Sequence, residues 1–230
     1  TGGDREGTCV LAAYYELAED ARLHVSRLES GLTKTVIYDQ RHSVLAARAR
    51  ADFYAAELGG EKIIVHSYGK LSGDHSEMNE RAIYAGRGRQ HLDFFYHIDH
   101  VGKKTKAEID LKGALADESK KIFRGTLDFK RGCAGSVGDE GDFAIQLDPK
   151  TKNISLPLLL CTEDDVQGNH ASSAGQLDQN TIYFLMSRGF TLEEARRIVV
   201  EALIRPIIDG MDEALREEVL VAVREKLDRE

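Results

Sequence analysis

The sequence has 230 residues, with 31 basic and 39 acidic side chains and a formal net charge of -8 at pH 7. That charge repels phosphate backbones, so nucleic acid is excluded as a partner. The most apolar stretches, 156–161 and 198–208, are too short to span a bilayer, and the N-terminus does not resemble a signal peptide. Three widely spaced cysteines argue against a disulfide framework, so we expect a cytoplasmic protein with no membrane segment.

Short bursts of alternating apolar and polar residues run from about Leu23 to Leu160 and predict β-strands. Residues 91–98 place every second side chain on an apolar face, and Ile109 and Leu111 repeat that spacing. The bursts recur at intervals of roughly a dozen to twenty residues, as in a solenoid whose turns stack short strands. Periodicity alone leaves a parallel β-helix, an antiparallel barrel and a jelly roll as alternatives.

After Asp178 the periodicity becomes helical. Thr191 and Glu194 have the spacing of a capping box, and Gly189 suits the end of a preceding helix. Pro206 is expected to kink or stop the helix that the box begins. The predicted core stripe of that helix consists of Ala195, Ile198, Val199, Ala202 and Leu203.

A last helix is predicted from about Asp212 to Asp228. Val200, Ile204 and Val221 fall off the predicted stripes, so the helical region carries more apolar surface than one contact with the β-domain would cover. Two readings remain open, packing on two neighbours within the chain and docking of another protein.

Several motifs occur in a fixed order. They are 100–113, 123–129, 156–161, and the segment 164–178 followed by the helix-like 182–190. In this order they resemble the core of the SufB/SufD family, the scaffold subunits of the SUF machinery for iron–sulfur cluster assembly. The resemblance covers roughly the second two-thirds of the chain. It implies a right-handed parallel β-helix over 1–177 and a C-terminal helical domain over 178–230.

The resemblance also implies a non-catalytic scaffold. Its C-terminal helices would bind a SufC-type ABC ATPase, and it would pair with a SufB-type subunit or with a second copy of itself. Full-length family members usually carry a further N-terminal region, and this sequence opens on Thr1 without an initiator methionine. A fragment, a trimmed chain and a minimal family member are therefore the alternatives.

His170 is the strongest candidate ligand for a transient iron–sulfur cluster. It lies among small residues in 169–173, where we expect a corner that leaves the imidazole accessible. The residues alone favour a histidine bonded to corner carbonyls, whereas the resemblance carries a functional histidine onto this position. Cys161 is the second candidate, because thiolates are the preferred ligands of such clusters. Its alternative role is that of a buried apolar filler.

Two positions depart from the SufB-type pattern. The cysteine that helps hold a nascent cluster falls at Asp142, and the companion glutamate falls at Ala171. The chain therefore resembles a SufD-type or a minimal subunit more than a cluster-binding SufB. Cys133, in a basic turn, is expected to be a loop residue whose pKa the turn could lower, and Cys9 has no assignable role.

A cupin-like metalloenzyme is the competing hypothesis. Histidines near the strands, joined by Asp or Glu, could form a facial metal site in a barrel. These are His66, His75, His91, His97 and His100. They form no compact histidine motif. The glycine-containing run 85–89 is a poor match to a phosphate-binding loop and is expected to be a turn.

Overall fold

The computed structural model describes residues 6–31 and 33–228, so Thr1, on which the expectation about the N-terminus depended, lies outside it. Within these residues the strands are β1 (Gly7–Leu17), β2 (Arg22–Glu29), β3 (Thr35–Leu45), β4 (Arg50–Glu57), β5 (Lys62–Leu71), β6 (Glu77–Gly86), β7 (His91–His100), β8 (Lys106–Leu115), β9 (Lys120–Phe129), β10 (Ser136–Gln146), β11 (Lys152–Cys161) and β12 (Val166–Gln176). The helices α1 (Gln179–Ser187), α2 (Leu192–Asp209) and α3 (Glu213–Leu227) follow. The predicted order of strands and then helices is confirmed.

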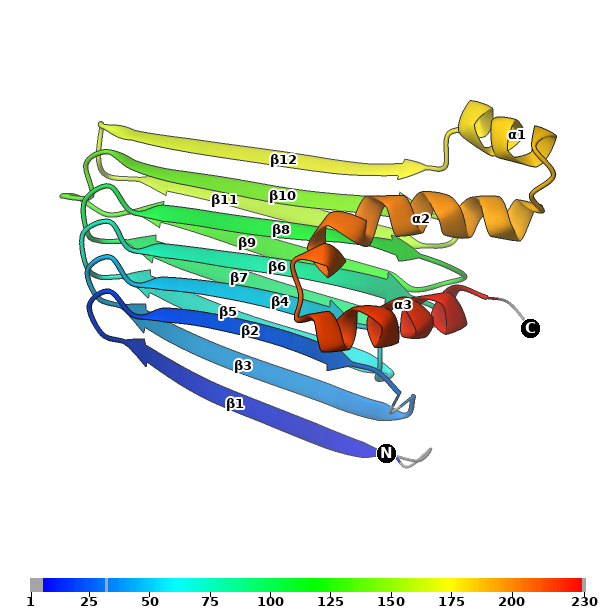
Figure 1. Cartoon of the computed structure of the whole chain (residues 1–230), viewed down its shortest axis with the longest axis horizontal. Coiled ribbons are helices and arrows are strands. Elements are labelled where there is room, and N and C mark those ends of the chain that lie inside the picture. The colour runs from blue at the N-terminus through cyan, green and yellow to red at the C-terminus, as the bar shows by residue number, and fades with distance from the viewer. Residues whose placement is uncertain (1–5, 32, 229–230) are drawn as a thin grey trace.

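The strands form two parallel sheets that face each other (Figure 1). The odd sheet has the order β1-β3-β5-β7-β9-β11, and the even sheet has the order β12-β10-β8-β6-β4-β2. Each turn of the chain adds one strand to each sheet, which makes a parallel β-helix of about six turns. Every pairing between the described strands is parallel, which excludes the antiparallel barrel and the jelly roll. The cupin-like hypothesis required such a barrel and is therefore wrong about the fold.

The main core lies between the two sheets. The predicted inward side chains of β7 and β8 are fully or almost fully buried, as the alternating pattern requires. They are Leu92, Phe94, Tyr96, Ile98, Ile109 and Leu111. The period-two signal therefore identified the interior face correctly in the middle turns of the solenoid.

The turns at one end of the strands stack on one another. Four of them place a residue other than glycine in the left-handed region, at Asp20, Arg48, His75 and Lys104. The amide of each of these residues donates a hydrogen bond to a carbonyl in the turn of the next coil, as from His75 to Lys103 at 2.8 Å. His75 is thus a turn residue, and the hydrogen bonds between coils offset the cost of its backbone conformation.

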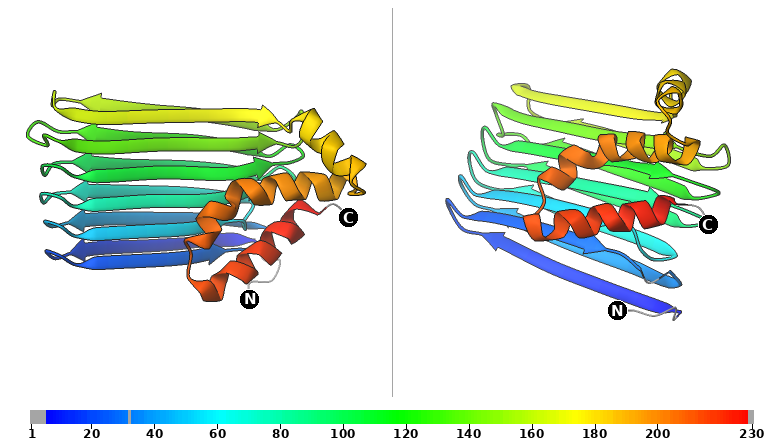
Figure 2. Two further views of the ribbon diagram at one scale, coloured as in Figure 1. Left: turned by 45° about the horizontal axis from the view of Figure 1, so that its top comes forward. Right: turned by 45° about the vertical axis from the view of Figure 1, so that its right-hand side comes forward.

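Helices α2 and α3 cover part of the outer face of the even sheet (Figure 2). A second apolar cluster joins them to the ends of β4 and β6, and it includes Ile83 and Ala85 of β6 together with Ile207 and Ile208 of α2. None of the three described helices combines the length and apolarity that a bilayer crossing requires.

The capping box at Thr191 and Glu194 is confirmed, and Gly189 has a φ of +97° just after α1, as predicted for a helix end. Helix α2 continues through Pro206 to Asp209, so of the two predicted effects of this proline, a kink or a stop, the stop is excluded. The helix bends in its last turns, which suits the kink that a proline imposes (Figure 2).

The predicted core stripe of α2 needs correction. Its buried residues include Val200 and Ile204, which the sequence placed off the stripe, while Ile198 is exposed. Both sets have helical spacing, and contact with the even sheet and α3 decides which set is buried. Helix α3 begins after Asp212 and ends before Asp228, as predicted.

Two substitutions on α2 test this packing. Ile208→Ala should lower the free energy of unfolding by about 2–4 kcal/mol, because Ile208 is fully buried between helix and sheet. Ile198→Ala, on the same helix but 36% exposed, should cost less than about 1 kcal/mol. Urea unfolding of both variants measures the difference, and equal costs would contradict the described docking of α2.

Candidate functional site

His170 lies in the middle of β12, at the open end of the solenoid. The predicted corner is wrong, because residues 166–176 form a regular strand that pairs with β10. Strand β12 is the last strand of the even sheet, and almost all of its residues are exposed. Because it has no buried face to fill, its sequence lacks the alternating apolar pattern of the inner strands. The His170 side chain is itself exposed, so the expected accessibility of the imidazole is confirmed.

Glu140 is the direct partner of His170 in the strand pairing. Partners in a parallel sheet face the same side, so His170 extends the row of Glu140 toward the end of the solenoid. Glu140 is only 4% exposed, and neither of its carboxylate oxygens has a hydrogen-bond partner among the described residues. Gly125 of β9 makes room for this group, because a Cβ at Gly125 would lie 2.1 Å from Oε1 of Glu140.

The environment of Glu140 favours its protonated form. Burial raises the pKa of Glu140 to about 8, and the nearby carboxylate of Asp142 adds to the shift. Asp142 is buried but paired, since Lys121 donates a hydrogen bond from Nζ to Asp142 Oδ1. Burial also lowers the pKa of Lys121, although Asp142 opposes the shift.

Asp142, onto which the resemblance maps the SufB-type cysteine, therefore has a structural partner. Its carboxylate neutralises Lys121, whose ammonium also reaches the Tyr84 hydroxyl at 3.2 Å. Ala171 follows His170 and pairs with Gly141, on the opposite face of the strand from Glu140. Neither position supplies a free soft ligand.

The cysteines differ from what the sequence suggested. Cys161 ends β11 as predicted but is exposed, so its interpretation as a buried filler is wrong. Cys133 is a loop residue, as predicted, but it is fully buried, and burial raises the pKa of its thiol, whereas a basic turn could have lowered it. Cys9 is half-buried on β1.

Cys161 and His170 both lie in the last turn of the solenoid. Leu159 packs toward Gly168, since a Cβ at Gly168 would lie 3.4 Å from Leu159 Cδ1. His170 is two residues further along β12, whereas Cys161 is two residues further along β11 toward the turn. The two candidate ligands are therefore set on opposite sides of the Leu159–Gly168 contact.

The other histidines do not converge. His97 and His100 are on opposite faces of β7, because the residues of a strand alternate. His100 is buried beside Thr105, at 2.7 Å, and burial lowers its pKa to about 4. His91 lies at the other end of β7, and His66 on β5 contacts Tyr38. The run 85–89 ends a strand and enters a turn, as expected.

The SUF system FeS cluster assembly, SufBD core domain, is the family whose model matches this chain, over residues 4–203. The chain belongs to this family. The parallel β-helix and the helices after it agree with the architecture that the sequence resemblance implied. The match includes all twelve strands and extends into α2 of this SufBD core domain.

Individual relatives agree with that assignment. The chain is 27% identical to the iron–sulfur cluster assembly protein SufD of Bacillus subtilis over 204 residues, which cover 88% of this chain and 46% of the relative. It is 20% identical to SufD of Escherichia coli over 210 residues, covering 90% of this chain and 50% of the relative. A SufBD family protein of Mycobacterium leprae is 26% identical over 235 residues, covering 97% and 60%. The chain thus spans about half the length of these SufD relatives.

Glu140 is the site residue that sequence reasoning missed. The segment 138–142 consists of glycines and acidic residues and has no apolar residue, so its sequence is typical of a loop. Its register with His170 links positions that are thirty residues apart, and only the strand pairing reveals it.

The pKa of Glu140 predicts a pH-dependent stability. The folded chain holds a proton that the unfolded chain releases between the ordinary value of 4.5 and about 8, so stability falls as pH rises through this window. Glu140→Gln removes that loss. It should match the parent near pH 4.5 and exceed it by a few kcal/mol at pH 9, since one pKa unit corresponds to about 1.4 kcal/mol.

Urea unfolding of the two proteins across this pH range makes the comparison. The low-pH data act as the control for any effect of the substitution on packing. A difference between variant and parent that does not change with pH would contradict the buried, unpaired state of Glu140.

Proposed function

We propose that the protein acts as a SufD-type scaffold in SUF iron–sulfur cluster assembly, where it docks a SufC-type ATPase and pairs with a second scaffold subunit. The exposed apolar surface on α1 is the observation that carries this proposal. In this arrangement the ATPase hydrolyses ATP and the scaffold itself is not an enzyme. The cytoplasm is the proposed compartment.

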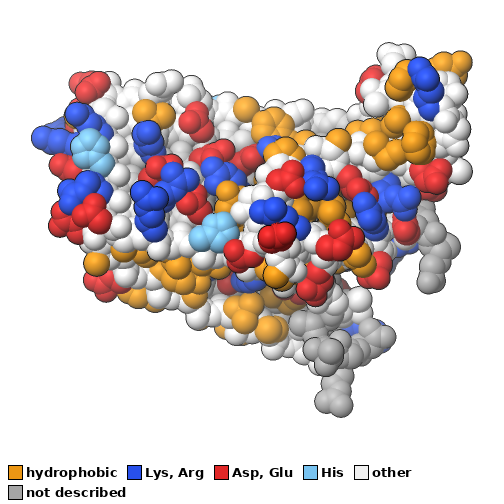
Figure 3. All heavy atoms as spheres, viewed as in Figure 1, with side chains coloured by type: hydrophobic (Ala, Val, Ile, Leu, Met, Phe, Trp, Pro, Cys, Tyr) orange, Lys and Arg blue, Asp and Glu red, His pale blue; other side chains and the backbone are white. Residues whose placement is uncertain are grey.

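Helix α1 buries little of its apolar surface within this chain. Of its nine residues, Ile182 is the buried one, while Tyr183 is 75% exposed and Phe184 is 55% exposed. The apolar surface continues past α1, and its exposed members are Tyr183, Phe184, Met186, Phe190, Leu192 and Ile198. Figure 3 shows apolar side chains gathered over this corner of the molecule. Contiguous exposed aromatic and aliphatic side chains are typical of protein-binding sites.

A double substitution tests the docking surface. Tyr183→Ala/Phe184→Ala should weaken binding of a SufC-type ATPase at least tenfold, because large aromatic side chains contribute most to such interfaces. Isothermal titration with the purified ATPase measures the affinity. Val10→Ser removes a 64% exposed apolar residue from β1, far along the chain from the helices, and serves as the control. An affinity for the ATPase that the double substitution leaves unchanged would refute the assignment of α1 as the docking surface.

The open end of the solenoid is the proposed contact with the second scaffold subunit. Strand β11 exposes a row of apolar side chains on its outer face, and β12 has a pairing partner on one side, β10. An unpaired strand edge favours extension of the sheet by another chain. The row consists of Ile154, Leu156, Leu158 and Leu160. Either a SufB-type subunit or a second copy fits this chemistry.

His170 would then lie at the interface between the two scaffolds. An exposed imidazole can ligate iron, and Cys161 offers an exposed thiol in the same turn of the solenoid. The cluster is cargo in this proposal, bound transiently, and the partner supplies the remaining ligands. Asp142 is not counted among the ligands, because it already forms an ion pair with Lys121.

Anaerobic reconstitution with iron and sulfide tests the cluster site. His170→Ala and Cys161→Ser should each lower the cluster yield, measured by visible absorption per chain, because each removes one exposed ligand. Cys9→Ser is the matched thiol control, since Cys9 lies on β1 in the first turn. Equal yields from all the proteins would remove the site and leave the fold untouched.

A further inference from the structure

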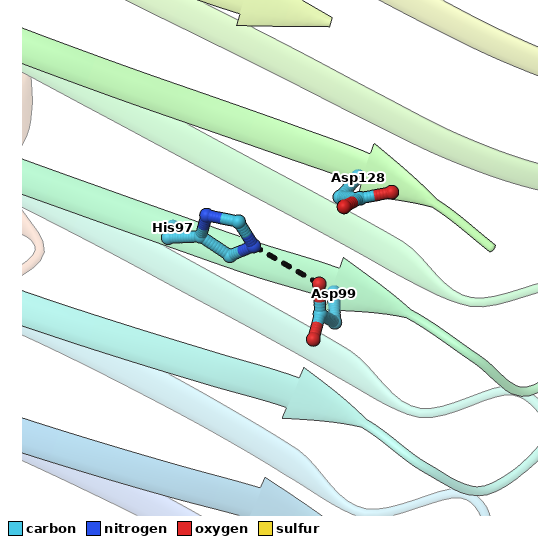
Figure 4. A group of neighbouring side chains, drawn as sticks. All are labelled: His97, Asp99 and Asp128. Atoms are coloured by element: carbon cyan, nitrogen blue, oxygen red, sulfur yellow. Dashed lines mark hydrogen bonds and ion pairs between the residues drawn. The ribbon is translucent and has the colours of Figure 1, made fainter. Parts of the chain in front are cut away.

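A second group of potential metal ligands lies on the outer face of the odd sheet, away from β12. His97 and Asp99 come from β7 and Asp128 comes from β9, as Figure 4 shows. One ligand atom from each residue lies within 4.8 Å of the others. The group combines an imidazole with two carboxylates, a ligand set that suits divalent first-row metal ions.

The backbone and the neighbouring rings hold this group in place. Asp99 and Asp128 are direct partners in the pairing of β7 with β9, so their carboxylates face the same side. The His97 ring stacks on Tyr68 at 5.2 Å and lies near Phe95 at 6.2 Å between centroids. The ligands therefore need little ordering when an ion binds.

The negative charge of Asp99 and Asp128 is stabilised by a neighbouring cation. Two carboxylates directly opposite each other on neighbouring strands repel, and here each side chain is only 10% exposed. Lys130 supplies the positive charge, with Nζ at 2.5 Å from Asp128 Oδ2 and 3.3 Å from Asp99 Oδ1. Lys130 is 43% exposed, and its flexible side chain can leave this position toward solvent.

We propose that His97, Asp99 and Asp128 bind a divalent transition-metal ion, which takes the place of the Lys130 ammonium. The Nε2 atom of His97 lies 3.0 Å from Asp99 Oδ1. Two adjacent ligands with metal bonds of about 2.1 Å are about 3.0 Å apart when they subtend a right angle, so this pair already has the required spacing. Water completes the coordination on the exposed side. The site is separate from His170 and does not depend on cluster assembly.

Anaerobic titration with Co²⁺, read by its visible absorption and by calorimetry, tests this site. The parent should bind one ion here. Asp128→Asn should lower the affinity at least about tenfold, because it removes a direct charged ligand. Lys130→Met should raise the affinity by a few fold, since the ion no longer competes with an ammonium. This gain cannot come from a variant that simply unfolds.

Asp93→Asn is the matched control, because Asp93 also faces outward on β7 but pairs with Arg124 outside the group. Its Co²⁺ affinity should equal that of the parent. Absence of Co²⁺ binding, or unchanged affinity in both Asp128→Asn and Lys130→Met, would overturn the inference. Binding that is lost in His170→Ala and kept in Asp128→Asn would also overturn it, while leaving the proposed scaffold function intact.

Discussion

Parallel, in-register pairing between successive turns is the constraint on which the rest of the structure depends. Each strand residue has a partner one turn away that faces the same side, so like positions form rows along the solenoid. The stacked row of Tyr14, His42, Tyr68 and His97 follows directly from this pairing. The same rule sets Glu140 beside His170 and Asp99 beside Asp128. Both candidate sites are therefore products of register, whatever their distance in sequence.

The solenoid interior accepts charged groups where a partner is available. Arg41 lies between Asp39 and Glu80, and Lys121 pairs with Asp142, although all five side chains are almost fully buried. An unpaired buried charge is costly, whereas a paired one is tolerated. Glu140 is the contrasting case, because its carboxylate has no hydrogen-bond partner among the described residues and its burial raises its pKa, which favours the neutral form. Glu140 lies on β10, one turn before the open end of the solenoid that β12 forms.

The outer faces of the two sheets differ in what covers them. Helices α2 and α3 cover part of the even sheet through the second apolar cluster. The outer face of the odd sheet carries the aromatic row on its middle strands and the exposed leucines on β11. Helix α1 extends beyond both sheets (Figure 1). The proposed ATPase and the proposed second scaffold thus use different surfaces, while Leu160 of the exposed β11 row lies beside Asp128 of the proposed ion site in the strand pairing.

The sequence by itself determined the strands of the middle turns and the capped helices, because period two, period 3.6 and capping chemistry are local. The family came from the resemblance of motifs in a fixed order. The sequence failed for β12, for the buried stripe of α2 and for Cys161, since burial there depends on which elements happen to cover them. The division into domains at 177 and 178 remains a prediction. Tertiary structure alone decided that Glu140 joins His170 and that Asp128 joins His97, because strand register brings together residues about thirty positions apart.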